Sequence, residues 1–287
     1  MSRIAYVNGR YVPLAEAGVH IEDRGFQFAD AVYEYFCVFD GKLADAPGHI
    51  ERLWRSLGEL RIPAPMSEAA LRVVLAQTVR LNRVKQGSVY VQVTRGTAPR
   101  DHAFPDPAPQ PGLIVTCKPL DFAAAEKRAE VGVKVLTQPD IRWGRCDIKT
   151  VGLLPNVLAK QAARETGAYE AWLVDDLGFV TEGASTNAWI IDAEGVLRTR
   201  DTNANILRGV TRKGLIDLAE EAGIPVSQQP FTVEEAKGAK EAFITAASTF
   251  VMPVVAIDGA KIGDGRPGPV AKRLRALYLG NARSTAQ

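Results

Sequence analysis

A lysine near the middle of the chain has a context suited to amine chemistry. Lys149 stands in Asp147-Ile148-Lys149-Thr150, at or just before the start of a helix predicted from Pro155 to Thr166. The positive end of a helix dipole disfavours an ammonium ion, and a neutral lysine amine is a nucleophile. Most lysines are merely solvated, so this position alone leaves both interpretations open.

Two other segments combine small residues with groups that could bind a ligand. Thr181-Glu182-Gly183-Ala184-Ser185-Thr186-Asn187 places a carboxylate in a predicted loop between two strands, although a plain polar connection is the simpler interpretation. Leu207-Arg208-Gly209-Val210-Thr211-Arg212 precedes a predicted helix, whose first N–H groups could hold a phosphate. An ordinary helix start explains that segment equally well.

Arg100 and His102 lie two residues apart on a Pro-rich loop predicted from 95 to 112. A guanidinium offers a fork of donors to a carboxylate, although surface Arg and His are usually just solvated. Metal binding is not expected, because His20, His49 and His102 are far apart and the three cysteines form no CxxC pair.

The stretch Gly263-Asp264-Gly265-Arg266-Pro267-Gly268 matches the GxGxxG pattern of dinucleotide-binding folds. That pattern requires a preceding strand, a following helix and the rest of a βαβ unit. Too few residues follow Gly268 to complete a βαβ unit, and prolines flank this glycine. We therefore predict a surface turn.

The elements that must position these residues mix strands and helices without strict βαβ alternation, which favours an α+β fold. Asn8-Gly9 and Asp40-Gly41 predict hairpin turns. Strands 171–174 and 187–191 are expected to form a hairpin pair. The strands are predicted at 4–7, 11–12, 32–39, 89–94, 113–117, 131–136, 171–174, 187–191, 196–199 and 241–245, and the helices at 49–60, 67–82, 155–166, 211–222 and 270–278.

Composition narrows the class of protein. The 287 residues suggest about two domains. A net charge of +2 without basic runs argues against nucleic-acid binding, and the lack of long apolar stretches argues against a membrane protein. Three scattered cysteines and the lack of a signal-peptide pattern predict a cytoplasmic protein.

Six motifs, in their order and spacing, resemble the class IV pyridoxal-phosphate-dependent aminotransferases from about Tyr6 to Gly268. Within that family, the pair Arg100 and His102 resembles D-amino acid transaminases, since branched-chain, chorismate-derived and R-amine relatives lack it in this form. The motifs are Asp23-Arg24-Gly25-Phe26, Tyr33-Glu34, His49-Ile50-Glu51-Arg52-Leu53, Asp147-Ile148-Lys149, Thr181-Glu182-Gly183 with Asn187, and 207–212.

The resemblance implies a two-domain α+β fold with the cofactor cleft between the domains. An N-terminal α/β domain would cover 1–120, and a C-terminal domain over 121–287 would carry the Schiff-base lysine. Lys149 would hold pyridoxal 5'-phosphate and shuttle a proton. Glu182 would pair with the pyridine nitrogen and keep the ring able to accept electrons.

The resemblance also implies a phosphate site. Arg52, the backbone amides of Val210 and Thr211, and the segment with Ala247 and Ser248 would hold the phosphate. Relatives place a hydroxyl where Ala247 stands, so this position offers only its N–H. Arg52 lies off the apolar face of helix 49–60, which suits either a cleft or a solvated surface.

For the substrate, the resemblance implies that Tyr33, Arg100 and His102 bind the carboxylate, with Arg142 and Trp143 lining the same region. The loop with Arg100 and His102 would reach into the neighbouring subunit's site, which implies a homodimer.

The predicted activity is transfer of an amino group from a D-amino acid, such as D-alanine, to a 2-oxo acid, such as 2-oxoglutarate. The alternatives are a branched-chain L-aminotransferase, an R-amine transaminase or an aminodeoxychorismate lyase on the same scaffold. A non-catalytic binding protein is disfavoured, because it would need neither Lys149 nor Glu182.

Overall fold

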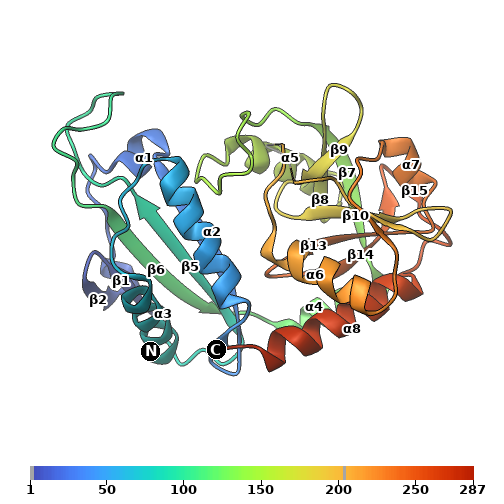
Figure 1. The fold of residues 1–287 in the computed structure, drawn as a ribbon, viewed down its shortest axis with the longest axis horizontal. Coiled ribbons are helices and arrows are strands. Elements are labelled where there is room, and N and C mark those ends of the chain that lie inside the picture. The colour runs from blue at the N-terminus through green and yellow to red at the C-terminus, as the bar shows by residue number, and fades with distance from the viewer. Residues whose placement is uncertain (1–2, 203–204) are drawn as a thin grey trace. The chain divides into compact units, whose positions relative to one another are not determined.

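The computed structural model describes residues 3–202 and 205–287, which divide into two compact units (Figure 1). Unit 1 contains the chain up to Asp121 together with Ile148–Gly152 and Thr285–Gln287, and unit 2 contains Phe122–Asp147 and Leu153–Ser284. The segment with Lys149 therefore packs in unit 1, whereas the sequence analysis assigned the lysine to the C-terminal domain. The boundary at residue 120 remains a prediction.

Unit 1 is built on a six-stranded sheet in the order β2-β1-β6-β5-β3-β4, in which all neighbours are antiparallel. The turns predicted at Asn8-Gly9 and Asp40-Gly41 join β1 to β2 and β3 to β4. Asn8 and Asp40 adopt positive φ, which these hairpin turns require. The strands are β1 (Ile4–Val7), β2 (Arg10–Pro13), β3 (Ala31–Phe39), β4 (Lys42–Leu43), β5 (Gly87–Thr94) and β6 (Gly112–Pro119).

Two amphipathic helices, α2 (Ala46–Glu59) and α3 (Glu68–Leu81), pack their apolar residues against this sheet. Ser67 caps α3 as predicted, because its side chain accepts a hydrogen bond from Ala70 N. Alternate residues of β3, including Val32, Phe36 and Val38, enter the same core. The one-turn helices η1 (Leu14–Glu16) and α1 (Arg24–Phe28) precede β3.

The Lys149 segment runs along the edge of β3. Thr150 pairs with Val32, Tyr33 N donates to Lys149 O at 3.0 Å, and Val151 N donates to Ala31 O at 3.2 Å. Helix α5 begins only at Leu154. The expectation that Lys149 lies at or just before the helix start is therefore wrong, because main-chain bonds to β3 hold it instead.

Unit 2 contains a nine-stranded mixed sheet in the order β12-β11-β10-β13-β14-β7-β8-β9, with β15 paired to β14. The pairs β14–β7 and β7–β8 are parallel, and the chain between β7 and β8 includes α5. The strands are β7 (Val133–Pro139), β8 (Glu170–Val174), β9 (Val180–Gly183), β10 (Asn187–Ile191), β11 (Leu197–Arg198), β12 (Val226–Ser227), β13 (Glu241–Ala246), β14 (Phe250–Ile257) and β15 (Ala260–Lys261).

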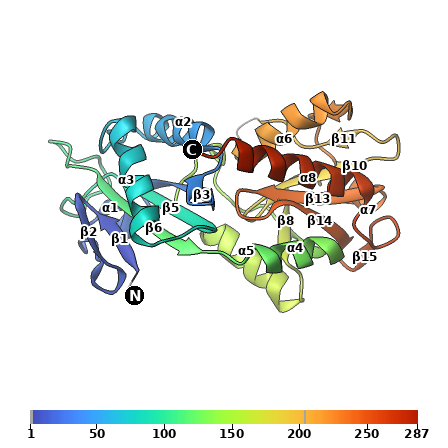
Figure 2. The ribbon, with the colours of Figure 1, turned by 90° about the horizontal axis from the view of Figure 1, so that it is seen from below.

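Helices cover both faces of this sheet. Figure 2 shows α6 and α8 on one side of it and α4 and α5 on the other. Their mixture with strands confirms the predicted α+β class. The helices are α4 (Phe122–Val131), α5 (Leu154–Glu165), α6 (Val210–Glu221), α7 (Val233–Lys237) and α8 (Pro269–Ser284). Within residues 3–202 and 205–287, none of the helices has the length and apolar character of a membrane-spanning segment.

The predicted hairpin between 171–174 and 187–191 is wrong. The first strand, β8, pairs with β7 and β9, whereas the second, β10, pairs with β11 and β13. A turn closed by Asp175 causes the difference, because its carboxylate accepts from Leu177 N and Phe179 N and returns the chain into β9. Glu182 consequently lies in a strand and not in the predicted loop.

The GxGxxG segment forms the predicted turn before α8. The Glu241 carboxylate accepts hydrogen bonds from Val270 N at 3.0 Å and Ala271 N at 2.8 Å. A Cβ on Gly268 would lie 2.0 Å from the Glu241 carboxyl carbon. This helix start therefore binds an internal carboxylate, and the glycine lets that carboxylate approach.

Candidate functional site

The amine of Lys149 lies against an aromatic ring. Its Nζ is 4.1 Å from the ring centroid of Tyr33, the neighbouring residue across the edge of β3. The side chain is half-buried, and within the described residues its Nζ has no hydrogen bond or ion pair. A partly enclosed amine without an acceptor is suited to forming a covalent bond with a ligand.

Arg52 is buried in a cluster with Glu34 and His49. Arg52 Nε and Nη2 donate to Glu34 Oε1 and Oε2 at 2.7 and 2.9 Å, and His49 Nδ1 lies 2.7 Å from Glu34 Oε2. Burial alone would raise the pKa of Glu34, but Arg52 and His49 outweigh it and hold this pKa well below its usual range. The solvated-surface alternative for Arg52 is excluded, since its exposed fraction is 9%.

Sequence reasoning assigned no role to Glu34 or His49. Two signals could have found them. Glu34 occupies a core position in β3, between Val32 and Phe36, where a carboxylate needs a partner. His49 and Arg52 are three residues apart on α2 and so share a face.

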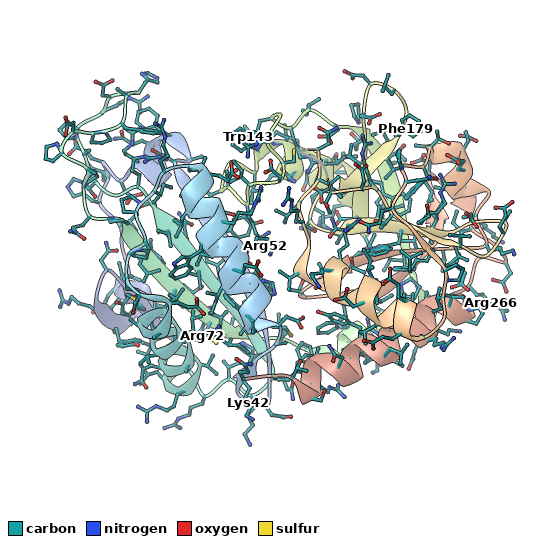
Figure 3. All side chains as sticks on the ribbon, in the orientation of Figure 1. Lys42, Arg52, Arg72, Trp143, Phe179 and Arg266 are labelled. Carbon is teal, nitrogen blue, oxygen red and sulfur yellow. The ribbon has the colours of Figure 1, made fainter. Side chains whose placement is uncertain are left out.

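Helix α2 connects this cluster to the lysine. Ser56 lies one turn after Arg52, and its Oγ accepts from Lys149 N at 3.5 Å. Figure 3 shows Arg52 on the middle of α2. One helix therefore carries both the arginine and a contact to the lysine segment.

In unit 2, Glu182 is a buried carboxylate that receives several donors. Arg142 Nη1 forms an ion pair with Glu182 Oε1, Asn187 Nδ2 donates to Oε2 at 3.0 Å, and Leu207 N donates to Oε1 at 3.1 Å. The predicted motif residues Glu182 and Asn187 are thus in direct contact. The structure also brings in Leu207, from a separate motif.

Asp140 fixes Arg142 from the other side. Arg142 Nη2 donates to Asp140 Oδ2 at 2.7 Å, and Thr181 Oγ1 donates to the same oxygen at 2.7 Å. Burial would lower the pKa of Arg142, but Asp140 and Glu182 raise it above its ordinary value. Asp140 was missed by sequence reasoning, and Arg142 was expected near the substrate; no residue pattern signals their pairing. Figure 3 shows Trp143 on the segment that follows β7.

The phosphate candidates of unit 2 gather at one end of the β10–β13 pair. Gly209 caps α6, and a Cβ there would lie 2.0 Å from Asn187 Oδ1, so only glycine permits this approach. Asn187 pairs with Thr245, one residue before β13 ends at Ala246. The N–H groups of Val210 and Thr211 therefore open α6 at the same end as the turn with Ala247 and Ser248.

That turn ends in a buried hydroxyl. Thr249 Oγ1 has no hydrogen-bond partner among the described residues, although it is shielded from solvent. A buried hydroxyl without a partner is costly unless a ligand supplies one. This orphaned atom, next to Ser248, fits an anion-binding site and was not anticipated from the sequence.

Arg100 and His102 lie elsewhere in unit 1. Arg100 Cζ is 4.5 Å from the ring centroid of Phe28, and the rings of His102 and Phe28 are 5.4 Å apart. Among the described residues, no hydrogen bond, ion pair or ring contact joins either side chain to Tyr33 or Lys149.

The comparisons with known proteins all find aminotransferases. The model of the family "Amino-transferase class IV" matches residues 31–257. The chain is 40% identical to a D-alanine aminotransferase from Staphylococcus haemolyticus over 94% of both chains, and 41% identical to one from Bacillus licheniformis over 93% of both. The crystal structure of the branched-chain aminotransferase from the archaeon Thermoproteus uzoniensis with norvaline matches with a TM-score of 0.84 and 25% identity, over 99% of this chain and 97% of that one.

Proposed function

Because the chain belongs to the class IV aminotransferases, which depend on pyridoxal 5'-phosphate, we propose that it transfers an amino group from a D-amino acid to a 2-oxo acid. D-alanine and 2-oxoglutarate are the expected representatives of the two substrates. The observation that carries this proposal is the 40% identity, over almost the whole chain, to enzymes named for D-alanine. The pair Arg100 and His102 supports the same substrate class.

The cofactor, when bound, supplies an aldehyde that takes up the amino group and a ring that accepts the electrons left at the substrate carbon. Lys149 would bind it through Nζ and carry a proton to and from the reacting carbon. The absence of an acceptor around this Nζ, within the described residues, supports that role. Glu182 would accept a hydrogen bond from the pyridine nitrogen and keep a proton there.

Arg52 would bind the phosphate, together with the N–H groups of Val210, Thr211 and Ala247, and Ser248. The Glu34 carboxylate orients the Arg52 guanidinium, which supports this role. The partnerless Thr249 hydroxyl beside Ser248 supports an anion at the turn.

Tyr33, Arg100 and His102 would bind the substrate carboxylate, and the last two would do so in a partner subunit of a homodimer. The lack of contact between this pair and Lys149 within the described part of unit 1 supports a role in a second subunit. We also propose a cytoplasmic location, which the three free cysteines support.

The test uses purified protein, D-alanine or L-alanine, and 2-oxoglutarate. The protein should absorb visible light from its bound cofactor and transaminate D-alanine, and Lys149→Ala should abolish turnover while Lys118→Ala, at an exposed lysine, should not. Activity with L-alanine alone would support one of the other activities of this family and defeat the proposal. A colourless protein unable to take up pyridoxal 5'-phosphate would defeat any aminotransferase activity.

A further inference from the structure

The loop that carries Arg100 and His102 is fastened to α1 by a buried arginine. Arg24 has an exposed fraction of 3%, and its Nη1 donates to Asp101 O at 2.6 Å while Nη2 lies 3.4 Å from His102 O. Its Nε donates to Asp30 Oδ2 at 2.9 Å. One guanidinium thus binds a carboxylate on one side and two carbonyls of the loop on the other.

The ring of Phe28 supports the two side chains of the pair. Arg100 Cζ lies 4.5 Å and Arg24 Cζ lies 4.8 Å from its centroid, and the ring of His102 lies 5.4 Å away. Cations over an aromatic face are attracted to the ring quadrupole. Arg100 and His102 are exposed, and within the described residues both side chains contact this ring.

Helix α1, which carries Arg24 and Phe28, is itself fixed to the sheet. Asp30 also binds Arg95, through contacts of 2.6 and 2.9 Å, and Arg95 is the first residue after β5. Asp23 caps α1 and accepts from Thr94 Oγ1 at 2.7 Å, and Arg24 N donates to Gly96 O at 2.9 Å. Helix α1 is therefore tied to the end of β5 and gives the exposed loop a rigid base.

Resting on the proposed function, we propose that Arg24 and Phe28 are positioning residues for the carboxylate-binding pair Arg100 and His102. Arg24 bonds to the loop main chain, and Phe28 contacts both side chains of the pair. A long, exposed side chain loses rotamer entropy when it binds, and restraint before binding reduces that cost. The two residues therefore act on substrate affinity, through the geometry of the pair.

The first experiment compares Arg24→Lys and Phe28→Leu with Phe26→Leu as the matched control. Phe26 lies on the same short helix but is 72% exposed. Lysine cannot span Asp30 and two carbonyls, and leucine offers no aromatic face. We expect each variant to raise KM for both D-alanine and 2-oxoglutarate about tenfold, with kcat changed less than about twofold, since restraint of the pair contributes to binding. The control should leave both constants unchanged.

The second experiment repeats Arg24→Lys in an Arg100→Ala, His102→Ala background. If Arg24 acts through the pair, it has no further effect on KM there, and the effects are strongly non-additive. A tenfold rise in KM in both backgrounds would overturn the inference, because a general loss of stability would act in both. Phe28→Leu provides the same test if Arg24→Lys does not fold.

The two proposals fail in different ways. Wild-type protein without activity on D-alanine would overturn the proposed function and this inference with it. Active wild-type protein, with KM unchanged in Arg24→Lys and Phe28→Leu, would overturn this inference alone.

Discussion

The buried ion clusters of the two units use the same chemistry with opposite arrangements. In unit 1, one carboxylate, Glu34, is completely enclosed and binds a guanidinium and an imidazole. In unit 2, one guanidinium, Arg142, binds two carboxylates, those of Asp140 and Glu182. The first cluster thus has an excess of donors, and the second has an excess of negative charge.

The difference matches the proposed roles. An acid that holds an arginine presents a cation of fixed orientation, which suits a phosphate. An arginine that holds an acid presents an oriented carboxylate, which suits a protonated ring nitrogen. In each cluster the group proposed to face the ligand is oriented by its opposite charge. If this comparison is right, removing the ligand-facing Glu182 carboxylate affects catalysis most, removing the enclosed Glu34 carboxylate affects stability, and weakening the contact of Arg142 with Glu182 affects catalysis less.

The largest effect is expected from Glu182→Gln, because an amide cannot supply the negative charge that the pyridine nitrogen requires. We expect kcat for D-alanine transamination to fall about 10³-fold, or about 4 kcal/mol. Glu170→Gln is the matched control, since Glu170 is a fully buried carboxylate of unit 2 that binds Lys160 and Ser185. The control should lower the melting temperature but leave kcat within about threefold. Equal kcat losses in Glu182→Gln and Glu170→Gln would show that Glu182 affects kcat no more than another buried carboxylate of unit 2 does.

Glu34→Gln should mainly affect stability. Removing one partner of a buried ion pair costs about 3 kcal/mol or more, which urea unfolding of the holoenzyme at pH 7 would measure. The folded-state pKa of Glu34 is lowered, so its stabilisation is complete above the unfolded-state value of about 4.3 and is lost as the pH falls toward the folded-state value.

The difference in unfolding free energy between wild type and Glu34→Gln should therefore shrink below about pH 4. The matched control is Glu68→Gln, which breaks an exposed ion pair of 2.8 Å with Arg72 on α3. It should change stability by less than about 1 kcal/mol at any pH. A Glu34→Gln effect as small as this would contradict the enclosed role of Glu34.

The smallest effect is expected from Arg142→Lys. A lysine keeps the positive charge but cannot bind Asp140 and Glu182 at the same time, so Glu182 should be less well oriented. We expect kcat to fall about tenfold, or about 1.4 kcal/mol, with KM little changed. Arg145→Lys, at an arginine that is 45% exposed and pairs with Asp147, should have no effect on kcat. The same loss in both variants would argue against orientation of Glu182 by Arg142.

Much of unit 1 could be predicted because its helices α2 and α3 have one exposed and one buried side and its hairpins have local turn signals. The apolar spacing along α2 and α3 and the hairpin signal at Asn8-Gly9 are local features. In unit 2, β9 has the polar sequence Val-Thr-Glu-Gly but is entirely buried. The eight residues of β14 are almost all buried on both faces, so no alternation marks them, and no strand was predicted there.

The candidate site could likewise be predicted only where its residues stand in local sequence motifs. Lys149, Glu182 and Arg52 were named from motifs, which are local in sequence. Glu34 in β3 orients Arg52 in α2, and Arg142, after β7, orients Glu182 in β9; both contacts join separate elements. Those contacts depend on strand register and helix packing, which a single sequence does not specify residue by residue.

The discontinuous make-up of unit 1 has a consequence for any attempt to divide the chain. A fragment that ended at Asp121 would lack the stretch that hydrogen-bonds to Ala31 and Tyr33, and also Gln287, which exchanges two main-chain bonds with Leu43. Uncovered strand edges of this kind invite aggregation. The five residues around Lys149 thus have a structural role besides the catalytic role proposed for the lysine, since the amino-terminal unit needs them to complete its own sheet edge.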